Sequence, residues 1–249
     1  MAGPTYLVLD IETVPDAELY TPPEPAPGAE RGDRPGSPFP PLYACRPVMV
    51  GAAWLDETLS CTLLGTLGEG DDEHALLETF SGFMTQHQPH LITWNGRSFD
   101  LPVLALRALR HAVPMPWYYQ QRDYRHRYSE EGGHLDLCDI LADHGAARST
   151  SLAAACHLIG LPGKEGIDGS QVEGLHAAGQ WEALRQYCLG DVVQTAFLFL
   201  RQRLLAGLLD RPAYVAATSA LLAGVDADGR LASLVAGVDR GRLLLEGAR

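Results

Sequence analysis

Acidic side chains in three separate segments have the types and spacing needed to bind metal ions. Asp10 and Glu12 lie in "YLVLDIET", Asp100 ends "ITWNGRSFD", and Tyr187 and Asp191 belong to "YCLGD". Carboxylates held close together repel one another and raise each other's pKa unless a cation neutralises them. If the fold gathers these groups at one point, we expect two divalent cations to bind there.

The first pair lies in an apolar run, residues 5–13, that predicts a buried strand. Asp10 and Glu12 are two residues apart, so both side chains leave the same face of that strand. Burying two bare carboxylates is costly unless something pairs with them. The alternative is that the strand frays and both side chains are solvated.

Asp100 follows the turn at Asn95 and Gly96, which comes after a predicted strand over 90–95. Loops at strand ends commonly hold functional groups on a rigid scaffold. The alternative is that Asp100 is simply the N-cap of the helix predicted over 100–113, a position that Asp favours.

The last pair lies in the longest helical pattern, residues 179–209. Tyr187 and Asp191 are four residues apart and therefore share a helical face. The alternative is a half-buried Tyr beside a surface Asp. Gly190, between them, costs about 1 kcal/mol of helix stability relative to Ala, which suggests that another part of the chain approaches closely there.

Composition indicates a globular protein and argues against a general polyanion binder. The chain has 249 residues, of which 46% are hydrophobic, and its net charge is −12. Proteins that bind polyanions usually carry a basic field. There is no cationic signal-peptide start, no apolar run of membrane-spanning length and no zinc spacing among the five scattered cysteines. We therefore expect reduced thiols, a cytoplasmic location and no contact with membranes.

The remaining patterns predict alternating strands and helices, and hence an α/β fold with a mixed sheet. A hairpin is expected over 46–65, followed by a helix over 71–87. A short element at 134–141 precedes a capped helix at 149–160, and Arg107 and Arg110 are expected to face solvent on their helix. Residues 15–42 hold nine prolines and predict an irregular loop.

Taken together, "LVLDIET", "NGRSFD" and "YCLGD" resemble the three motifs of the DnaQ-like, ribonuclease H-like 3′–5′ exonucleases, and the tyrosine four residues before the last aspartate is typical of the DEDDy subgroup. "HLDLCDIL", "SLAAACHLIGLPGK" and "YCLGDVVQTAFLFLR" extend the resemblance over residues 5–205. The chain is most similar to stand-alone bacterial exonucleases related to the proofreading domain of family-B DNA polymerases. This resemblance implies a ribonuclease H-like mixed central sheet flanked by helices.

The resemblance also implies a role for each acidic residue. Asp10, Glu12 and Asp191 would hold a first Mg²⁺ or Mn²⁺, Asp10 would bridge to a second ion, and Asp100 would hold that ion. The pair of ions would activate a water for attack on the terminal phosphodiester. Tyr187 would orient that water.

Substrate contacts are expected at several further positions. Thr13, Asn95 and Phe99 are candidates to contact the 3′-terminal nucleotide. The stretch "WYYQQRDYRHRYSEEGGH" interleaves arginines with tyrosines, so Arg122 and Arg125 could bind phosphates while aromatic rings stack on bases. Lys164 is another candidate phosphate contact. The alternatives are a solvated polar loop and a surface lysine. His134 and Asp136 are expected to be structural.

The resulting hypothesis is a metal-dependent 3′–5′ exonuclease acting on single-stranded DNA rather than RNA and releasing nucleoside 5′-monophosphates. An exoribonuclease of the same fold, a catalytically silent nucleic-acid-binding module and a structural metal-binding protein are the alternatives. Residues 1–210 are expected to form the exonuclease domain, with 211–249 a helical extension packed on it. The sequence leaves open the oligomeric state and a protein partner in replication or repair.

Overall fold

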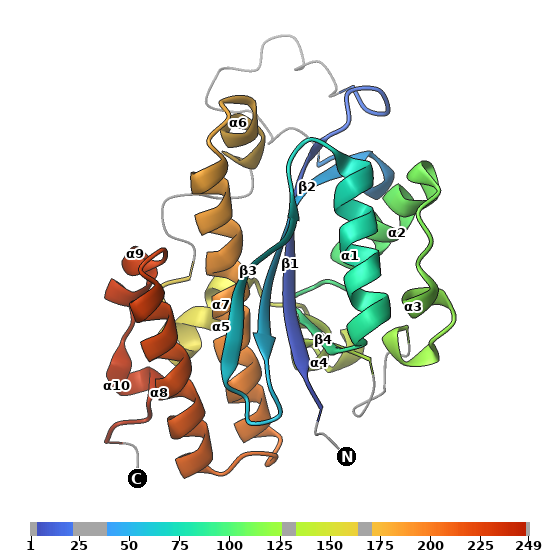
Figure 1. The fold of residues 1–249 in the computed structure, drawn as a ribbon. Helices are drawn as coiled ribbons and strands as arrows, with labels where there is room; N and C mark the ends of the chain where they lie inside the picture. The colour runs from blue at the N-terminus through green and yellow to red at the C-terminus, as the bar shows by residue number, and fades with distance from the viewer. Residues whose placement is uncertain (1–3, 22–38, 126–132, 164–170, 248–249) are drawn as a thin grey trace.

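A five-stranded mixed sheet lies between two layers of helices in the computed structural model, which describes residues 4–21, 39–125, 133–163 and 171–247 (Figure 1). The strand order is β3-β2-β1-β4-β5. β2 is antiparallel to β1 and β3, whereas β4 is parallel to β1 and β5 is parallel to β4. The prediction of an α/β fold with a mixed central sheet flanked by helices is therefore confirmed.

The elements follow the alternation that the sequence predicts. In chain order they are β1 (Tyr6–Pro15), η1 (Leu42–Ala44), β2 (Cys45–Leu55), β3 (Cys61–Glu69), α1 (Glu73–His87), β4 (His90–Thr93), α2 (Asp100–His111), α3 (Pro116–Tyr119), η2 (Arg122–Tyr124), β5 (His134–Asp136), α4 (Leu137–Leu141), η3 (Asp143–Gly145), α5 (Leu152–Ile159), α6 (Val172–Ala177), α7 (Trp181–Leu205), α8 (Arg211–Asp228), α9 (Ala232–Ala236) and α10 (Arg240–Leu243).

The first strand, β1, is the centre of the sheet, and its side chains alternate between two hydrophobic cores. Leu7 and Leu9 pack with α1 and α2 on one side, whereas Tyr6 and Val8 pack with α7 on the other. The even-numbered positions of β1 therefore face α7, and Asp10 and Glu12 continue that series.

Helix α7 lies very close to the sheet because a glycine faces it. Gly51 on β2 is paired with Asp10 on β1. A Cβ at Gly51 would lie 2.5 Å from the Cys188 sulfur and 3.2 Å from a Val192 methyl, distances at which side chains overlap. The expectation that another part of the chain approaches closely at Gly190 is wrong, because a Cβ there would meet only a Leu234 methyl, at 3.9 Å. The sheet, not the helix, supplies the glycine that this contact requires.

The opposite face of the sheet is covered by α1 and α2, which an ion-pair network connects. Arg107 of α2 is only 1% exposed and binds Glu73 at 2.5 Å and Asp16 at 2.8 Å. The expectation that Arg107 faces solvent is therefore wrong: two carboxylates compensate its charge in the interior. Arg110, one turn on, is one-third exposed and pairs with Glu18.

The C-terminal helices pack on the α7 side of the sheet (Figure 1). Tyr214, Leu221 and Leu234 belong to the same hydrophobic core as the buried face of α7. The Tyr214 hydroxyl donates a hydrogen bond to the Leu243 carbonyl at 2.8 Å, which ties α10 to α8. A domain boundary at residue 210 stays a prediction. Among the described helices, none combines the length and apolar run that a membrane span requires.

Candidate active site

The acidic pair on β1 lies beneath the helical turn that carries Tyr187 and Asp191. Glu12 is 6% exposed, and β1 continues to Pro15, so the alternative of a frayed, solvated strand end is wrong. The Cys188 sulfur lies 3.8 Å from the Asp10 carbonyl oxygen and 3.9 Å from its carboxylate. Ligand atoms of Asp10, Glu12 and Cys188 all lie within 4.8 Å of one another. The two outer motifs therefore meet at Asp10.

Asp100 reaches the same strand from the other side. It is the first residue of α2 and is 3% exposed. Its carboxyl group accepts a backbone hydrogen bond from Ile11, the residue between Asp10 and Glu12. The N-cap alternative is wrong, since Phe99 occupies that position without a side-chain cap. The middle motif thus joins the other two at the carboxyl end of β1.

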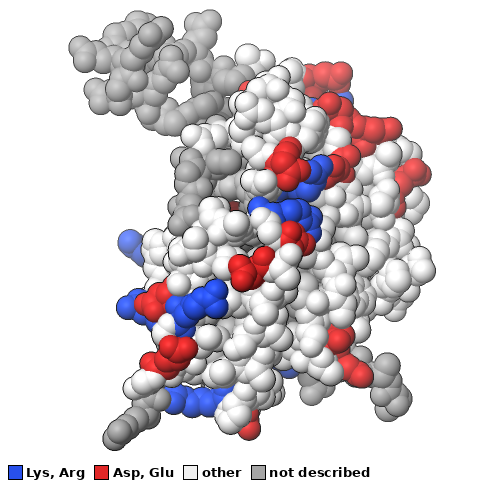
Figure 2. Space-filling view, turned by 60° about the vertical axis from the view of Figure 1, so that its left-hand side comes forward, with Lys and Arg blue, Asp and Glu red and all other residues white. Residues whose placement is uncertain are grey.

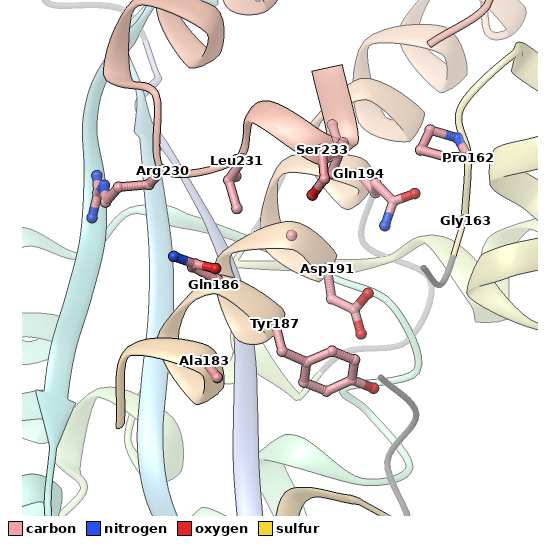
Figure 3. A pocket seen from close by; sticks show the side chains of 12 residues that line it. Pro162, Gly163, Ala183, Gln186, Tyr187, Asp191, Gln194, Arg230, Leu231 and Ser233 are labelled. Atoms are coloured by element: carbon pink, nitrogen blue, oxygen red, sulfur yellow. The ribbon is translucent and has the colours of Figure 1, made fainter. Parts of the chain in front are cut away.

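On α7, Tyr187 and Asp191 line a pocket of about 140 Å³ (Figure 3). Tyr187 is half-buried and Asp191 is 8% exposed, so the alternative of a surface aspartate is wrong. Both side chains point the same way from the helix in Figure 3. The opposite wall comes from residues 230–234, before and within α9. The C-terminal segment, which the resemblance did not cover, therefore borders the candidate site.

Asp136 holds the turn that leads to Asp100. One carboxylate oxygen accepts the Asn95 backbone N–H at 2.9 Å and the other accepts that of Arg97 at 2.9 Å. The first oxygen also accepts the N–H groups of Cys138 and Asp139, at 3.1 and 3.3 Å. Asp136 is thus the N-cap of α4 and the anchor of the turn after β4 at once. This supports the expected structural role.

Burial makes the Asp100 carboxyl group sensitive to pH. Its pKa is raised from 3.8 to about 7, mainly by desolvation and also by the nearby charge of Asp136, while backbone hydrogen bonds from its own amide and from Ile11 oppose the shift. The folded protein therefore binds a proton at Asp100 that the unfolded chain releases, in the window between about pH 4 and pH 7. The free energy of unfolding should fall as pH rises through that window.

We expect Asp100→Asn to remove this pH dependence in metal-free protein. At pH 8 the variant should be more stable than the parent by up to about 4 kcal/mol, and the gap should close near pH 4. Urea unfolding of both proteins in EDTA, measured at several pH values, checks this. Parallel stability curves for the two proteins would contradict the assignment of a raised pKa to Asp100.

The three candidates for contacts with the terminal nucleotide lie around this acidic centre. Thr13 follows a β-bulge in the β1–β2 pairing, and its hydroxyl hydrogen-bonds to the Cys45 thiol. Asn95 is exposed and has a φ of 65°, a left-handed conformation that Asn tolerates. Phe99 is half-buried and its ring contacts that of Phe39. Their contacts with a nucleotide stay a prediction.

In the arginine- and tyrosine-rich stretch, some side chains are buried in the core and others are exposed. Tyr124 is 2% exposed and donates to the Pro89 carbonyl at 2.7 Å, so a base-stacking role for it is wrong. Arg125 is exposed and lies over the ring of Tyr119, which is 55% exposed. The Arg122 side chain and Lys164 lie outside the described residues. Arg125 therefore stays a candidate phosphate contact.

Charges on the face shown in Figure 2 alternate instead of gathering into a basic patch. Arg185 pairs with Glu69 at 2.6 Å, and Arg230 pairs with Asp228 at 2.5 Å. A cation that is already paired with a carboxylate offers little to a phosphate. The guanidinium groups of Arg185 and Arg230 are therefore weak candidates for phosphate contacts.

The donor set suits hard divalent cations better than zinc. Burial and the charges of Asp10, Glu12 and Asp191 hold the pKa of the Cys188 thiol well above its usual range, so in the metal-free protein the sulfur is a neutral thiol and a weak ligand. The other candidate ligand atoms at this site are carboxylate oxygens, which are the ligands that Mg²⁺ and Mn²⁺ prefer. The residues present therefore fit the cations that the sequence predicts.

Two features of the site carry no signal in the sequence. Cys188 lies between Tyr187 and Asp191, and its position beside Asp10 depends on the glycine across the sheet at position 51. Asp136 alternates with His134 on a short element, but its four N–H partners come from two separate segments. Only the assembled sheet brings these groups together.

A protein-family model matches most of the chain. Residues 37–232 match the model of a family described as predicted 3′–5′ exonucleases related to the exonuclease domain of PolB. The chain belongs to this family, and the predicted resemblance and class of enzyme are confirmed at that level. The match includes Asp100, Tyr187 and Asp191 and begins after Asp10 and Glu12. No curated protein matches the chain.

Solved structures of exonuclease I are similar to the chain at low identity. One covers 84% of this chain and 46% of its own length, with 16% identity and a TM-score of 0.39. Another, in complex with the inhibitor BCBP, covers 85% of this chain and 47% of its own, with 14% identity and a TM-score of 0.38. The chain spans about half the length of these proteins.

Proposed function

We propose that the protein is a metal-dependent 3′–5′ exonuclease that removes nucleotides from single-stranded DNA and releases nucleoside 5′-monophosphates. The observation that carries this proposal is the meeting of three acidic segments at one end of β1. Asp10 and Glu12 lie on the strand, Asp100 binds the Ile11 amide between them, and Cys188 seats the Tyr187–Asp191 turn on Asp10.

Each residue has a role in this proposal. Asp10, Glu12 and Asp191 would hold one cation, and Asp10 and Asp100 would hold a second. Two such cations supply an activated water and a stabilised leaving oxygen when bound. The water oxygen bonds to the terminal phosphorus, the bond from phosphorus to the 3′ oxygen breaks, and that oxygen takes up a proton. Tyr187 positions the attacking water through its hydroxyl.

Two alternatives remain distinguishable by experiment. An exoribonuclease would require the same acidic centre, so the sugar of the substrate decides between the two enzymes. A catalytically silent binding module would need none of the carboxylates. The acidic balance of the chain favours short-lived binding, because affinity for nucleic acid depends on phosphate neutralisation. A protein partner and the cytoplasmic location stay predictions.

The test uses 5′-labelled single-stranded DNA and RNA of matched sequence, incubated with Mg²⁺, Mn²⁺ or EDTA. We expect a metal-dependent ladder that shortens from the 3′ end, with DNA the faster substrate. Faster loss of the RNA would favour the exoribonuclease. Absence of cleavage with either substrate and either metal, from folded protein, would contradict the proposal.

Replacing the tyrosine tests the positioning of water separately from metal binding. We expect Tyr187→Phe to slow cleavage about 10- to 100-fold, because a small misplacement of the nucleophile is costly while the carboxylates remain. Mn²⁺ affinity, measured by calorimetry, should not change. Cleavage at the parent rate would remove this role from Tyr187, and lost Mn²⁺ binding would show that its role is structural.

A further inference from the structure

Packing does not explain why residue 190, in the middle of α7, is a glycine. A glycine in a helix interior costs about 1 kcal/mol relative to Ala, so its presence needs a cause. No positive φ requires it, and a Cβ there would meet only the Leu234 methyl at an ordinary 3.9 Å. The missing side chain instead leaves open the floor of the pocket that Tyr187 and Asp191 line.

A second, independent feature of this pocket is an unsatisfied amide. Gln194, one turn beyond Gly190 on the same face, is 2% exposed, and its Oε1 atom has no hydrogen-bond partner. Buried polar atoms in native proteins almost always have a partner, and each exception calls for an explanation. In Figure 3 the amide of Gln194 lies between Pro162 and the carboxylate of Asp191. A ligand that donates a hydrogen bond would satisfy it.

The described lining of the pocket offers a phosphate no guanidinium or ammonium group that is not already paired. Asp191 contributes a carboxylate to the wall. The one guanidinium in the lining, that of Arg230, binds Asp228 and the Leu64 carbonyl and points away from Asp191 (Figure 3). At about 140 Å³ the pocket is well below the 300 Å³ or more of sites for whole small-molecule ligands. A pocket of this volume suits a ligand the size of one planar ring system.

From these features we propose that the pocket between α7 and α9 binds a nucleobase at the 3′ end of the substrate. The inference rests on the proposed function, which puts the cleaved bond beside Tyr187 and Asp191, both of which line the pocket. The base lies over Gly190, where any side chain would intrude, and donates a hydrogen bond to Gln194. Every unpaired base carries at least one N–H donor that could satisfy this acceptor, so the contact itself does not select among the four bases.

The test compares two glycines within helices, Gly190, which lines the pocket, and Gly82, which does not. Gly82 is exposed on α1, and a Cβ there would meet no atom within 4 Å. Both Gly190→Ala and Gly82→Ala should raise the melting temperature through helix propensity. Binding of dAMP with Mg²⁺ is then measured by calorimetry, because a mononucleotide has no phosphodiester bond for the enzyme to cut. Gln194→Leu is the third variant.

We expect Gly190→Ala to weaken dAMP binding about tenfold or more, as one methyl group in a shaped pocket commonly does. Gly82→Ala should bind like the parent, and Gln194→Leu should bind dAMP more weakly than the parent because the acceptor is lost. Equal dAMP affinity in the parent and Gly190→Ala, or no dAMP binding by the parent, would overturn the pocket assignment.

Cleavage assays on the same proteins separate this inference from the proposed function. A parent that cuts no strand but binds dAMP in a Gly190-dependent way would refute the exonuclease and retain the pocket. A parent that cuts DNA while Gly190→Ala keeps the same KM and kcat would refute the pocket and retain the exonuclease.

Discussion

Asp10→Ala should abolish metal-dependent cleavage while leaving the fold intact. Asp10 touches the turn of α7 and lies beside Glu12, and in the proposed function it would contact both cations. Such ions contribute several kcal/mol to the transition state, and each 1.36 kcal/mol is a factor of ten in rate. A loss of about 10³-fold or more is expected in the ladder assay.

The same substitution should not lower stability in EDTA. Removing one of several neighbouring carboxylates relieves repulsion, so the melting temperature of metal-free Asp10→Ala should equal or exceed that of the parent. Glu78→Ala, which removes a carboxylate that is 61% exposed on α1, is the matched control and should keep full activity. Unfolding of Asp10→Ala, or turnover close to that of the parent, would contradict the assignment of Asp10 to the metal site.

Asp136→Ala should be among the most destabilising single substitutions in the chain. It removes the acceptor of four backbone N–H groups at a site that is 2% exposed. Each buried donor left without an acceptor costs about 1–3 kcal/mol, so a total loss of at least about 3 kcal/mol is expected in urea unfolding. The turn at Asn95 should shift, and cleavage should slow with it.

Asp136→Asn separates geometry from charge. An amide retains one acceptor oxygen, so the loss of stability should be smaller than for Ala. Because the Asp136 charge helps to raise the pKa of Asp100, its removal should lower that pKa and move the pH window of metal-free stability downward. Equal stability of Asp136→Ala and the parent would show that the four hydrogen bonds contribute little.

Much of the fold can be predicted from the sequence because the spacing of apolar residues along the chain indicates which side chains are buried. The apolar run over residues 5–13 predicts a buried strand, which becomes β1, and the long helical pattern around Val192 becomes α7. The positions of the acidic residues follow from these elements. Arg107 could not be predicted, because its helical position looks solvent-facing until Glu73 and Asp16 are brought to it by other elements.

The pocket could not be predicted for a similar reason. Gly190 appears in the sequence as a cost to the helix, and only the fold shows that the close contact is made by Gly51 on the sheet. Gln194 belongs to an apolar stretch and has no signal of its own. Packing between segments far apart in the chain, which no local pattern reports, decides both cases.

The central position of the first strand determines when the enzyme can become active during its own synthesis. β1 leaves the ribosome first, yet its neighbour β4 and the helix that completes the acidic centre come from residues about 80 and 180 positions later. Contacts of such long range form late and slowly. The nascent chain therefore carries its acidic strand without the Tyr187–Asp191 turn until translation has passed α7. The acidic centre is therefore assembled only after residue 205, where α7 ends, has been made.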